Sequence, residues 1–368
     1  MTTLPLAGLT VVAVEQAVAA PFATSRLADA GARVIKIERP EGDFARGYDD
    51  VAKGQASYFV WLNRGKESVT VDLASPGGKA RLAELLEGAD VLVQNLKPGA
   101  LARLGFGFER LEQDYPRLIT CSISGYGEGG PMAERKAYDL LIQAESGLCS
   151  VTGGPESAAR VGISIVDIAT GATAYSAILE ALIRRGVTGK GANITVSMFD
   201  VMADWLTVPL LNHEGGKSPR RLGLAHPSIS PYSVYTCADG KQVLISVQSD
   251  REWRKLARIF LNDEALGTDP RFATNVARVR NRPETDALVA AAFARRTGDQ
   301  AVEGLIAADV AFASVNDMEG LTHHPHLRRI TVDTPNGPVS YPAPAPVFVG
   351  EPRAYGAVPG LNPTEETA

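Results

Sequence analysis

Short runs of β-branched residues alternate with helix-forming stretches along the first part of the 368-residue chain. This alternation constrains the fold, because strands separated by crossover helices pair in parallel. We therefore predict a doubly wound, mainly parallel α/β sheet, with ligands at the carboxyl ends of its strands. The predicted strands span residues 9–14, 32–38, 68–73, 90–94, 118–124 and 193–197, and the predicted helices span residues 21–30, 77–86 and 198–211.

A smaller α+β domain is predicted where the composition changes. Residues 232–236 and 242–247 flank an Asp-Gly turn and predict a hairpin, and helical periodicity follows at 250–260, 282–294 and 299–308. Residues 212–230 are rich in Gly, Pro, Ser and Arg, which is typical of a linker. The expected organisation is a large domain at 1–211, this linker, a small domain at 231–330, and a segment at 331–368 that returns to the large domain.

Charge and cysteine content exclude several classes of protein. The 37 basic and 42 acidic residues give a net charge of −5, which argues against a nucleic-acid partner. The three cysteines are widely spaced without a CxxC pair, so neither a disulfide framework nor a thiolate metal site is predicted. There is no basic leader and no uncharged apolar run of about 18 residues. We therefore expect a cytoplasmic protein without a membrane span.

Asp167 stands at the predicted start of a helix. The apolar run 161–166 predicts a strand that delivers Asp167 to the first turn of a helix over residues 168–184. Unpaired N–H groups and the helix dipole favour an ionised carboxylate at such a position. The carboxylate is either an N-cap or a nucleophile, and the pattern alone leaves both interpretations open.

The motifs of several enzyme classes are missing. The turn after the first predicted strand, EQAVAAPFATSRLADAG, lacks the GxGxxG glycines, so a bound NAD or FAD is not expected. Three histidines lie close together at residues 323, 324 and 326. Pro325 breaks their spacing and no acidic or thiol ligand stands at a suitable interval, so no metal site is predicted.

Polar side chains follow two of the predicted strands. Arg39 comes directly after the second strand, and Asn95, Lys97 and Arg103 follow the strand at 90–94. Because the carboxyl ends of neighbouring parallel strands open on one crevice, these groups can meet the phosphates of one anionic ligand. Solvated surface side chains are the alternative interpretation of the same residues.

Several long segments together carry a family resemblance. They are LAGLTVVAVEQAVAAPFATSRLADAGARVIKIERPEGD, NRGKESVTVDLASPGGK, ADVLVQNLKPGALARLGFG, KAYDLLIQAESGL, the VDIATG around Asp167, and TDPRFATNVARVRNRP. In this order they resemble the family III CoA-transferases, which include the formyl-CoA and carnitine CoA-transferases and have the α-methylacyl-CoA racemases as relatives. The resemblance extends from end to end of the chain.

The resemblance implies that Asp167 is a catalytic nucleophile and that Tyr138 lies beside the reacting centre. Attack on an acyl-CoA thioester would give an aspartyl anhydride and then an aspartyl-CoA thioester, with coenzyme A as part of the substrate and with no metal and no tightly bound cofactor. The loop GYGEGG would supply N–H donors to the tetrahedral intermediates. By similarity, the coenzyme A contacts are Gln16, Ala17, Arg39, Val71, Asn95, Leu96, Arg103, Leu104 and Lys136. Some relatives carry a basic residue where this chain has Ala74, which puts one phosphate contact in doubt.

Racemase is the runner-up activity. The racemase relatives use a histidine next to an aspartate, whereas this chain has Tyr138 followed by Asp139. A tyrosine with an ordinary pKa near 10 is a poor base at neutral pH, so transferase is favoured. A non-catalytic acyl-CoA-binding protein is a third alternative, but such a protein would have no need of Asp167.

The sequence indicates the acceptor acid and the oligomeric state less directly than it indicates the reaction. Arg160, Arg220 and Arg221 are candidates to hold a second carboxylate, which favours a C4 to C5 dicarboxylic acid such as succinate, mesaconate or itaconate. The stretches DWLTVPLLNHEGG and GLAHPSISPY look most like mesaconate and succinyl-CoA members of the family. The family also implies an interlocked homodimer, in which each chain threads through the other.

Overall fold

The computed structural model describes residues 4–362, which form two compact units. The first unit contains the chain up to Leu148, the segment Arg160–Val208 and the chain from Arg328 onward. The second unit contains Cys149–Ala159 and Pro209–Leu327. Residues 149–159 therefore group with the second unit, although the sequence places them inside the large domain.

Hydrogen bonds explain why residues 149–159 join the second unit. The Arg221 side chain donates through Nε to the carbonyl oxygen of Gly154 at 3.1 Å. The backbone N–H of Gly223 donates to the carbonyl oxygen of Gly153 at 2.9 Å. These bonds join parts of the chain that are far apart in sequence, so local composition carries no sign of them.

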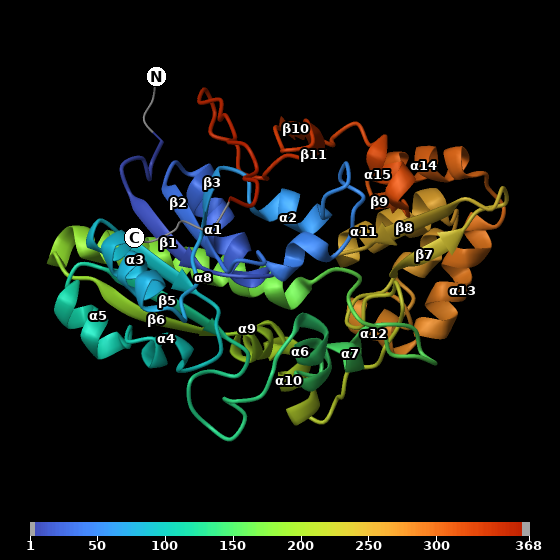
Figure 1. The fold of residues 1–368 in the computed structure, drawn as a ribbon. Coiled ribbons are helices and arrows are strands. Elements are labelled where there is room, and N and C mark those ends of the chain that lie inside the picture. The colour runs from blue at the N-terminus through green and yellow to red at the C-terminus, as the bar shows by residue number, and fades with distance from the viewer. Residues whose placement is uncertain (1–3, 363–368) are drawn as a thin grey trace. The chain divides into compact units, whose positions relative to one another are not determined.

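A six-stranded parallel sheet forms the centre of the first unit (Figure 1). Its strand order, β3-β2-β1-β4-β5-β6, reverses next to β1, which is where doubly wound sheets bind their ligands. The parallel pairing confirms the predicted α/β class. The strands are β1 (Thr10–Val14), β2 (Arg33–Glu38), β3 (Lys66–Thr70), β4 (Val91–Gln94), β5 (Ile119–Ser124) and β6 (Ala192–Ser197).

The third strand begins earlier than predicted, at Lys66 rather than at residue 68. Lys66, Ser68 and Thr70 alternate along β3 and are all buried. A lysine inside a strand is ordinarily a sign of exposure, but Lys66 ion-pairs with the buried Glu15 at 2.7 Å. Because Glu15 lies far from Lys66 in sequence, the polar residues at the start of β3 do not look like part of a buried strand.

Helix α8 (Ile165–Thr188) packs along α1 (Ala19–Asp29) and beside β5 and β6. Close approach requires small residues: a Cβ at Gly171 would lie 2.4 Å from the carbonyl oxygen of Ala19. Among the described residues, α8 is the one helix whose length and composition would suffice to cross a membrane. Its buried face, which includes Ala174 and Ile178, belongs to the core of the first unit, so the apolar composition has a packing explanation.

The strand predicted at residues 161–166 is wrong. The segment has no strand partner, and α8 already begins at Ile165. Side chains of α6 (Asp139–Glu145) take the backbone groups that a neighbouring strand would have paired: Gln143 accepts from the N–H of Val161 at 2.9 Å, and Asp139 accepts from that of Val166 at 2.7 Å. An apolar composition cannot distinguish these two arrangements.

The single helix predicted at residues 198–211 is two helices, α9 (Met198–Trp205) and α10 (Thr207–Glu214). Pro209 lies in the first turn of α10, where its missing N–H is tolerated, but it cannot continue the hydrogen bonds of α9. Helix α10 consequently extends into the predicted linker.

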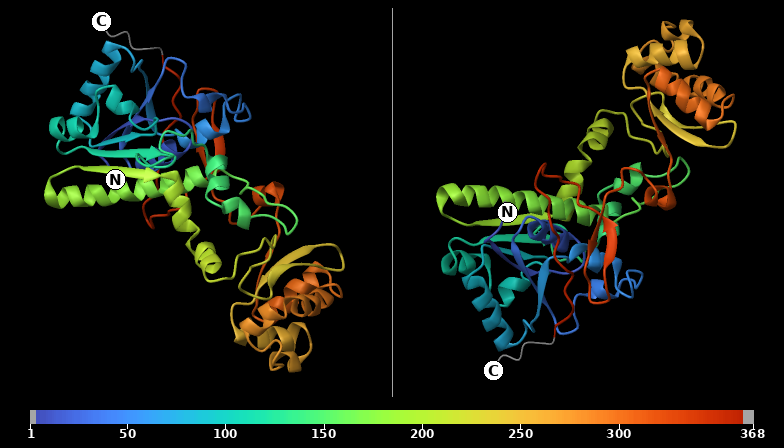
Figure 2. Two further views of the ribbon diagram at one scale, coloured as in Figure 1. Left: turned by 90° about the horizontal axis from the view of Figure 1, so that it is seen from below. Right: turned by 90° about the horizontal axis from the view of Figure 1, so that it is seen from above.

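The remaining elements of the first unit include a hairpin that the sequence did not predict. Its strands, β10 (Arg329–Val332) and β11 (Val339–Pro342), pair antiparallel and pack on α2 (Ser57–Leu62), as both views of Figure 2 allow the reader to follow. The other helices are η1 (Phe44–Gly47), α3 (Pro76–Glu87), α4 (Ala100–Arg103), α5 (Phe108–Asp114) and α7 (Leu148–Val151), the last of which ends in the second unit.

The second unit is a three-stranded antiparallel sheet covered by helices. The predicted hairpin is confirmed as β7 (Tyr232–Thr236) and β8 (Gln242–Ser246), and the unpredicted β9 (Ala311–Ser314) pairs with β8. The helix predicted at 250–260 changes pitch at Leu256. The helices are α11 (Asp250–Lys255), the π-helical turn η2 (Leu256–Phe260), η3 (Glu264–Gly267), α12 (Asn275–Arg280), α13 (Arg282–Phe293), α14 (Gly298–Ala307) and α15 (Met318–Thr322).

Candidate active site

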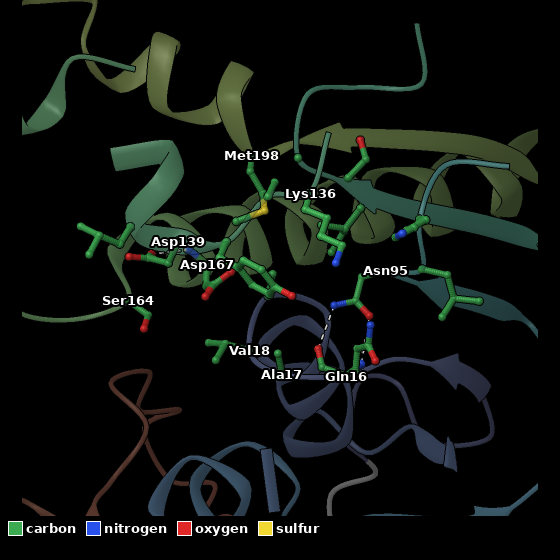
Figure 3. A pocket seen from close by; sticks show the side chains of 18 of the residues that line it. Gln16, Ala17, Val18, Asn95, Lys136, Asp139, Ser164, Asp167 and Met198 are labelled. Carbon is green, nitrogen blue, oxygen red and sulfur yellow. Dashed lines mark hydrogen bonds between the residues drawn. The ribbon is translucent and has the colours of Figure 1, made fainter. Parts of the chain in front are cut away.

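A cavity of about 390 Å³ lies at the carboxyl ends of β1, β4 and β5 in the first unit (Figure 3). Its walls come from the turn after β1, the loop after β4, the end of β5, the segment that enters α6, and the first turn of α8. This is the edge of the sheet at which ligands were expected. The predicted site residues that line it are Gln16, Ala17, Asn95, Leu96, Lys136, Tyr138 and Asp167.

The turn after β1 is held tightly although it contains no glycine. Asn95 accepts from the N–H of Gln16 at 2.9 Å and donates to the carbonyl oxygen of Gln16 at 2.8 Å. Ala17 has a φ of 62°, in the left-handed region that non-glycine residues rarely occupy. Asp43 accepts from the Ala17 N–H at 3.1 Å and so helps to keep this strained conformation.

A buried ionic network contacts the turn after β1 through Asp43. Lys36 ion-pairs with Asp43 at 2.8 Å, and Lys66 ion-pairs with Glu15 at 2.7 Å. Burial alone would raise the pKa of Glu15, but the positive charges of Lys66 and Lys36 bring it below its ordinary value. Burial lowers the pKa of Lys66 to about 8. These charges are paired with one another, so they stabilise the turn while leaving the cavity to other groups.

Asp139 caps helix α8 from a different helix. The side chain of Ser164, at the N-cap position, makes no capping hydrogen bond. Instead, Asp139 Oδ1 accepts from the N–H of Val166 at 2.7 Å and from that of Asp167 at 3.2 Å. Its other oxygen accepts from Gln143 at 2.6 Å. Both oxygens of Asp139 are therefore occupied by the protein.

Asp167 lies directly beside this cap, within the first turn of α8 (Figure 3). Burial, and then the negative charge of Asp139, raise the pKa of Asp167 to about 7. The helix start therefore does not lower the pKa of Asp167 as expected, and the N-cap interpretation is wrong, because Ser164 is at the N-cap position. The N–H groups at the start of α8, which would have stabilised the charge of the Asp167 carboxylate, already donate to Asp139. Within residues 4–362, no hydrogen bond or ion pair engages the Asp167 carboxylate.

Aromatic and basic side chains surround the two carboxylates. Tyr138 is 58% exposed and stands immediately before α6. Burial and nearby negative groups, Asp43 before Asp167, raise the pKa of Tyr48 to about 12, so this phenol stays protonated at neutral pH. Arg160 also lines the cavity. The opening is thus bordered by groups that can contact an acyl chain and an anionic substrate.

The remaining predicted contacts divide between a second cavity and the surface. A cavity of about 270 Å³ is lined by Arg39, Val71 and Leu104, and it shares Gln16 and Leu96 with the first. The two shared wall residues make the cavities neighbours at the carboxyl-end edge of the sheet.

Arg103 lines neither cavity and is exposed, which places it apart from the other predicted contacts. Ala74 does line the second cavity, so the wall there carries a methyl group where some relatives have a base. Of the glycine-rich loop GYGEGG, Gly125 lines the first cavity. No group of three or more His, Cys, Asp or Glu residues suited to a metal ion occurs in the described part of the chain.

Sequence reasoning missed several residues of the site. Tyr58 and Ser164 are linked by a hydrogen bond of 2.8 Å between their hydroxyl groups and come from segments far apart in the chain, so no local signal identifies them. Met198 directly follows β6, and its position after a predicted strand was a usable signal. The other missed residues include Asp43, Tyr48 and Phe44.

The first unit thus combines a parallel α/β sheet, a carboxylate in the first turn of a helix, a cavity at the strand ends and an adjoining cavity that contains Arg39. Comparison with known proteins identifies the class. CoA-transferase family III matches residues 6–363. The chain belongs to this family and is a CoA-transferase.

Curated relatives and a solved structure agree with this assignment. A succinate--glutarate CoA-transferase of Agrobacterium fabrum is 40% identical over 295 residues, which cover 77% of this chain and 73% of that protein. An acetyl-CoA:oxalate CoA-transferase of Acetobacter aceti is 41% identical over 291 residues, with 78% and 74% covered. The crystal structure of a CAIB/BAIF family protein from Brucella suis superposes with a TM-score of 0.82 at 36% identity, covering 98% of this chain and 97% of the other.

Proposed function

We propose that this protein transfers coenzyme A from an acyl-CoA to a carboxylic acid through covalent intermediates on Asp167. One observation carries the proposal: of the two carboxylates in the cavity, only Asp167 is available. Both carboxylate oxygens of Asp139 accept hydrogen bonds, one from Gln143 and the other from the first turn of α8. Asp167, in contrast, lines the cavity and has no hydrogen-bond partner for its carboxylate among the described residues. Asp139 then acts as a positioning residue and Asp167 as the nucleophile.

The first half of the reaction loads coenzyme A onto the protein. A carboxylate oxygen of Asp167 attacks the thioester carbonyl, the C–S bond breaks, and the thiolate leaves with the bonding electrons. A mixed anhydride joins Asp167 to the donor acyl group. The thiolate then attacks the aspartyl carbonyl of this anhydride, which releases the donor acid as a carboxylate and leaves an aspartyl-CoA thioester.

The second half repeats these steps in the opposite sense. The acceptor carboxylate attacks the aspartyl thioester, the thiolate leaves, and a second anhydride forms. Attack of the thiolate on the acceptor carbonyl gives the new acyl-CoA and regenerates the Asp167 carboxylate. No proton is consumed, because every attacking and leaving group is an anion. The reaction therefore needs Asp167 ionised, and a pKa of about 7 leaves about half of it in that form at neutral pH.

Transferase is favoured over racemase by the groups that line the cavity. Racemisation requires a base and an acid on opposite sides of the α-carbon. No histidine is present among the described residues that line this cavity, and Tyr138 occupies the position that matches the histidine of the racemase relatives. Incorporation of solvent deuterium at the α-carbon of a 2-methylacyl-CoA, without an acceptor acid, would contradict this choice.

A dicarboxylic acid is the acceptor that the cavity fits best. Arg160 lines the same cavity as Asp167 and has no ion pair within residues 4–362, so it is available to a second carboxylate. Arg221, another candidate, already donates to the carbonyl oxygens of residues 150, 154 and 155 in the second unit. The relative named for succinate and glutarate supports a dicarboxylate of C4 to C5 length such as succinate, mesaconate or itaconate, whereas the relative named for oxalate supports only the dicarboxylate class.

The coenzyme A contacts are proposed along the two neighbouring cavities. The adenosine-phosphate end is assigned to the second cavity, because Arg39 and the apolar side chains of Val71 and Leu104 line it. The pantetheine end is assigned to the first, beside the Gln16 to Ala17 turn. Substituting Arg39 by Met should weaken CoA binding measured by calorimetry, whereas the same change at exposed Arg103 should matter less if that residue stays outside the site.

Trapping the intermediate tests the nucleophile directly. The protein is incubated with succinyl-CoA without an acceptor, treated with hydroxylamine, and digested, and the peptide that carries Asp167 is examined by mass spectrometry. The expected product is a hydroxamate on Asp167 that is absent without the thioester. The Asp139→Asn variant is the matched control, since it retains Asp167. Modification of any residue other than Asp167 would overturn the assignment.

We also propose that the chain forms an interlocked homodimer, as its family implies. Light scattering after size exclusion should give the mass of a dimer that does not dissociate on dilution. A monomer at micromolar concentration would contradict it without affecting the assignment of Asp167.

A further inference from the structure

Helix α11, labelled in Figure 1, and the turn η2 that continues it carry a row of basic residues. Arg251, Arg254, Lys255 and Arg258 follow the spacing i, i+3, i+4 and i+7, which places them on one side of α11 and η2. The opposite side, with Trp253, Leu256 and Phe260, is fully buried in the core of the unit. The basic face is therefore directed away from that core.

This face forms the wall of a cavity of about 270 Å³ rather than a flat surface. The opposite wall is the short helix η3 with Gly267 and Thr268. A Cβ at Gly267 would lie 3.1 Å from Cγ of Arg254, so the glycine allows the two walls to approach each other. The Trp253 indole N–H donates to the carbonyl oxygen of Leu266 at 2.9 Å and ties the walls together. The cavity is thus a feature of the packed unit.

The charges in this cavity are incompletely balanced. Lys255 pairs with Asp309 at 2.6 Å, and the hydrogen bond from Lys255, with a weaker effect of Arg251, lowers the pKa of Asp309. The side chains of Arg251, Arg254 and Arg258 have no ion pair or hydrogen bond within the described residues. Glu264 is the one carboxylate that lines the cavity. Four cations against Glu264 and Asp309 leave an excess of positive charge on a chain whose net charge is −5.

A basic face of this kind works against the stability of the helix. Like charges at i, i+3 and i, i+4 destabilise a helix by about 0.2–0.5 kcal/mol per pair. Arg251 stands in this relation to both Arg254 and Lys255, and Arg258 does so as well. An ordinary solvated helix face alternates acids with bases and avoids this cost. A bound anion would remove the repulsion and satisfy the guanidinium groups at the same time.

We propose that this cavity is a second anion site, which binds a diphosphate group through Arg251, Arg254 and Arg258. Guanidinium groups bind phosphate oxygens in pairs of parallel hydrogen bonds, and the volume suits a compact polyanion rather than a whole cofactor. Lys255 adds charge while it stays paired with Asp309. The site lies in the second unit, and it depends on neither Asp167 nor the proposed transfer reaction.

Calorimetric titration of the full-length protein with inorganic pyrophosphate tests the proposal. The variant R254Q/R258Q should bind pyrophosphate at least about tenfold more weakly, because each lost charge-assisted hydrogen bond costs more than about 1.4 kcal/mol. The matched control is R280Q/R295Q, which removes the same charge from two exposed arginines of the same unit and should leave the affinity unchanged. Asp167→Ala should also bind pyrophosphate like the unaltered protein.

Further titrations identify the source of the diphosphate. ADP and coenzyme A carry the same group, so a loss of affinity for either in R254Q/R258Q, but not in R280Q/R295Q, names the natural ligand. If both double variants weaken ligand binding equally, the effect comes from long-range attraction by net charge, and the proposed site is wrong. Binding of RNA or of vesicles containing phosphatidylserine through these arginines, without binding of pyrophosphate, would also overturn it. Circular dichroism establishes that both variants are folded.

Discussion

Asp139 and Asp167 form an unequal pair of carboxylates. Asp139 accepts the N–H of Asp167 at 3.2 Å, so the residue that fixes the Asp167 backbone also places a negative charge next to its side chain. Burial and this charge together account for a pKa of about 7 at Asp167. The same contact therefore determines where the proposed nucleophile lies and how readily it ionises.

Replacement of Asp167 by Ala should abolish CoA transfer while CoA binding survives. The proposed covalent steps all occur on this side chain, so kcat is expected to fall by at least about a thousandfold. Steady-state assays with succinyl-CoA and a dicarboxylic acceptor measure the loss, and calorimetry measures CoA affinity. Turnover near that of the unaltered protein would disprove the nucleophile assignment.

The activity of the unaltered protein should rise with pH through about 7 and then level off. Only ionised Asp167 attacks the thioester, and its pKa is raised to about 7. Asp139→Asn retains an oxygen that can accept from the N–H groups of Val166 and Asp167 but removes the charge. The rising limb of kcat/KM should then move to lower pH. An unchanged limb in this variant would show that Asp139 does not influence the titration.

Asp167→Asn should stabilise the protein above pH 7. The folded-state pKa of Asp167 lies above that of an unfolded aspartate, so its favourable contribution is present at low pH and is lost as the pH rises from about 4 to about 7. Removing the ionisable group should raise the stability by about 4 kcal/mol at pH 8 and by less than about 1 kcal/mol at pH 4. Melting temperatures across this range measure the effect. Asp50→Asn, at an exposed position, is the control and should show no such trend.

Lys66→Met should strongly destabilise the first unit. The substitution leaves Glu15 buried without its closest cation, and breaking a buried pair costs about 3–5 kcal/mol. Arg33→Met breaks the exposed pair with Glu67, which joins β2 to β3, and should cost no more than about 1 kcal/mol. Urea unfolding followed by circular dichroism compares the two. Similar losses in both variants would contradict a stabilising role for the buried network.

Arg160→Met should change the choice of acceptor. If Arg160 holds the second carboxylate, kcat/KM for succinate should fall by about ten to a hundredfold, whereas that for a monocarboxylic acid of similar size, such as butyrate, should change little. The ratio of the two constants is the measurement. An equal fall for both acids would mean that Arg160 does not distinguish them.

Much of the site could be predicted because it follows strand ends. The strands ending at Val14, Gln94 and Ser124 are largely buried, and parallel pairing brings the residues after them to one edge of the sheet. Gln16, Asn95 and Gly125 therefore meet at the first cavity. The position of Arg103 could not be inferred in this way, because it belongs to the short helix α4, several residues beyond the end of β4.

Residue patterns along the chain were enough to predict the parallel α/β class, the antiparallel hairpin of the second unit and the family, since hydrophobic periodicity and ordered motifs are local properties. Which of the two carboxylates is free depends instead on contacts in the folded protein. Asp139 and Gln143 meet the start of α8 across an intervening segment of chain, occupy its amides and replace the predicted strand at 161–166. Hydrogen bonds and charges between residues distant in sequence set the pKa of Asp167, and no local pattern records them.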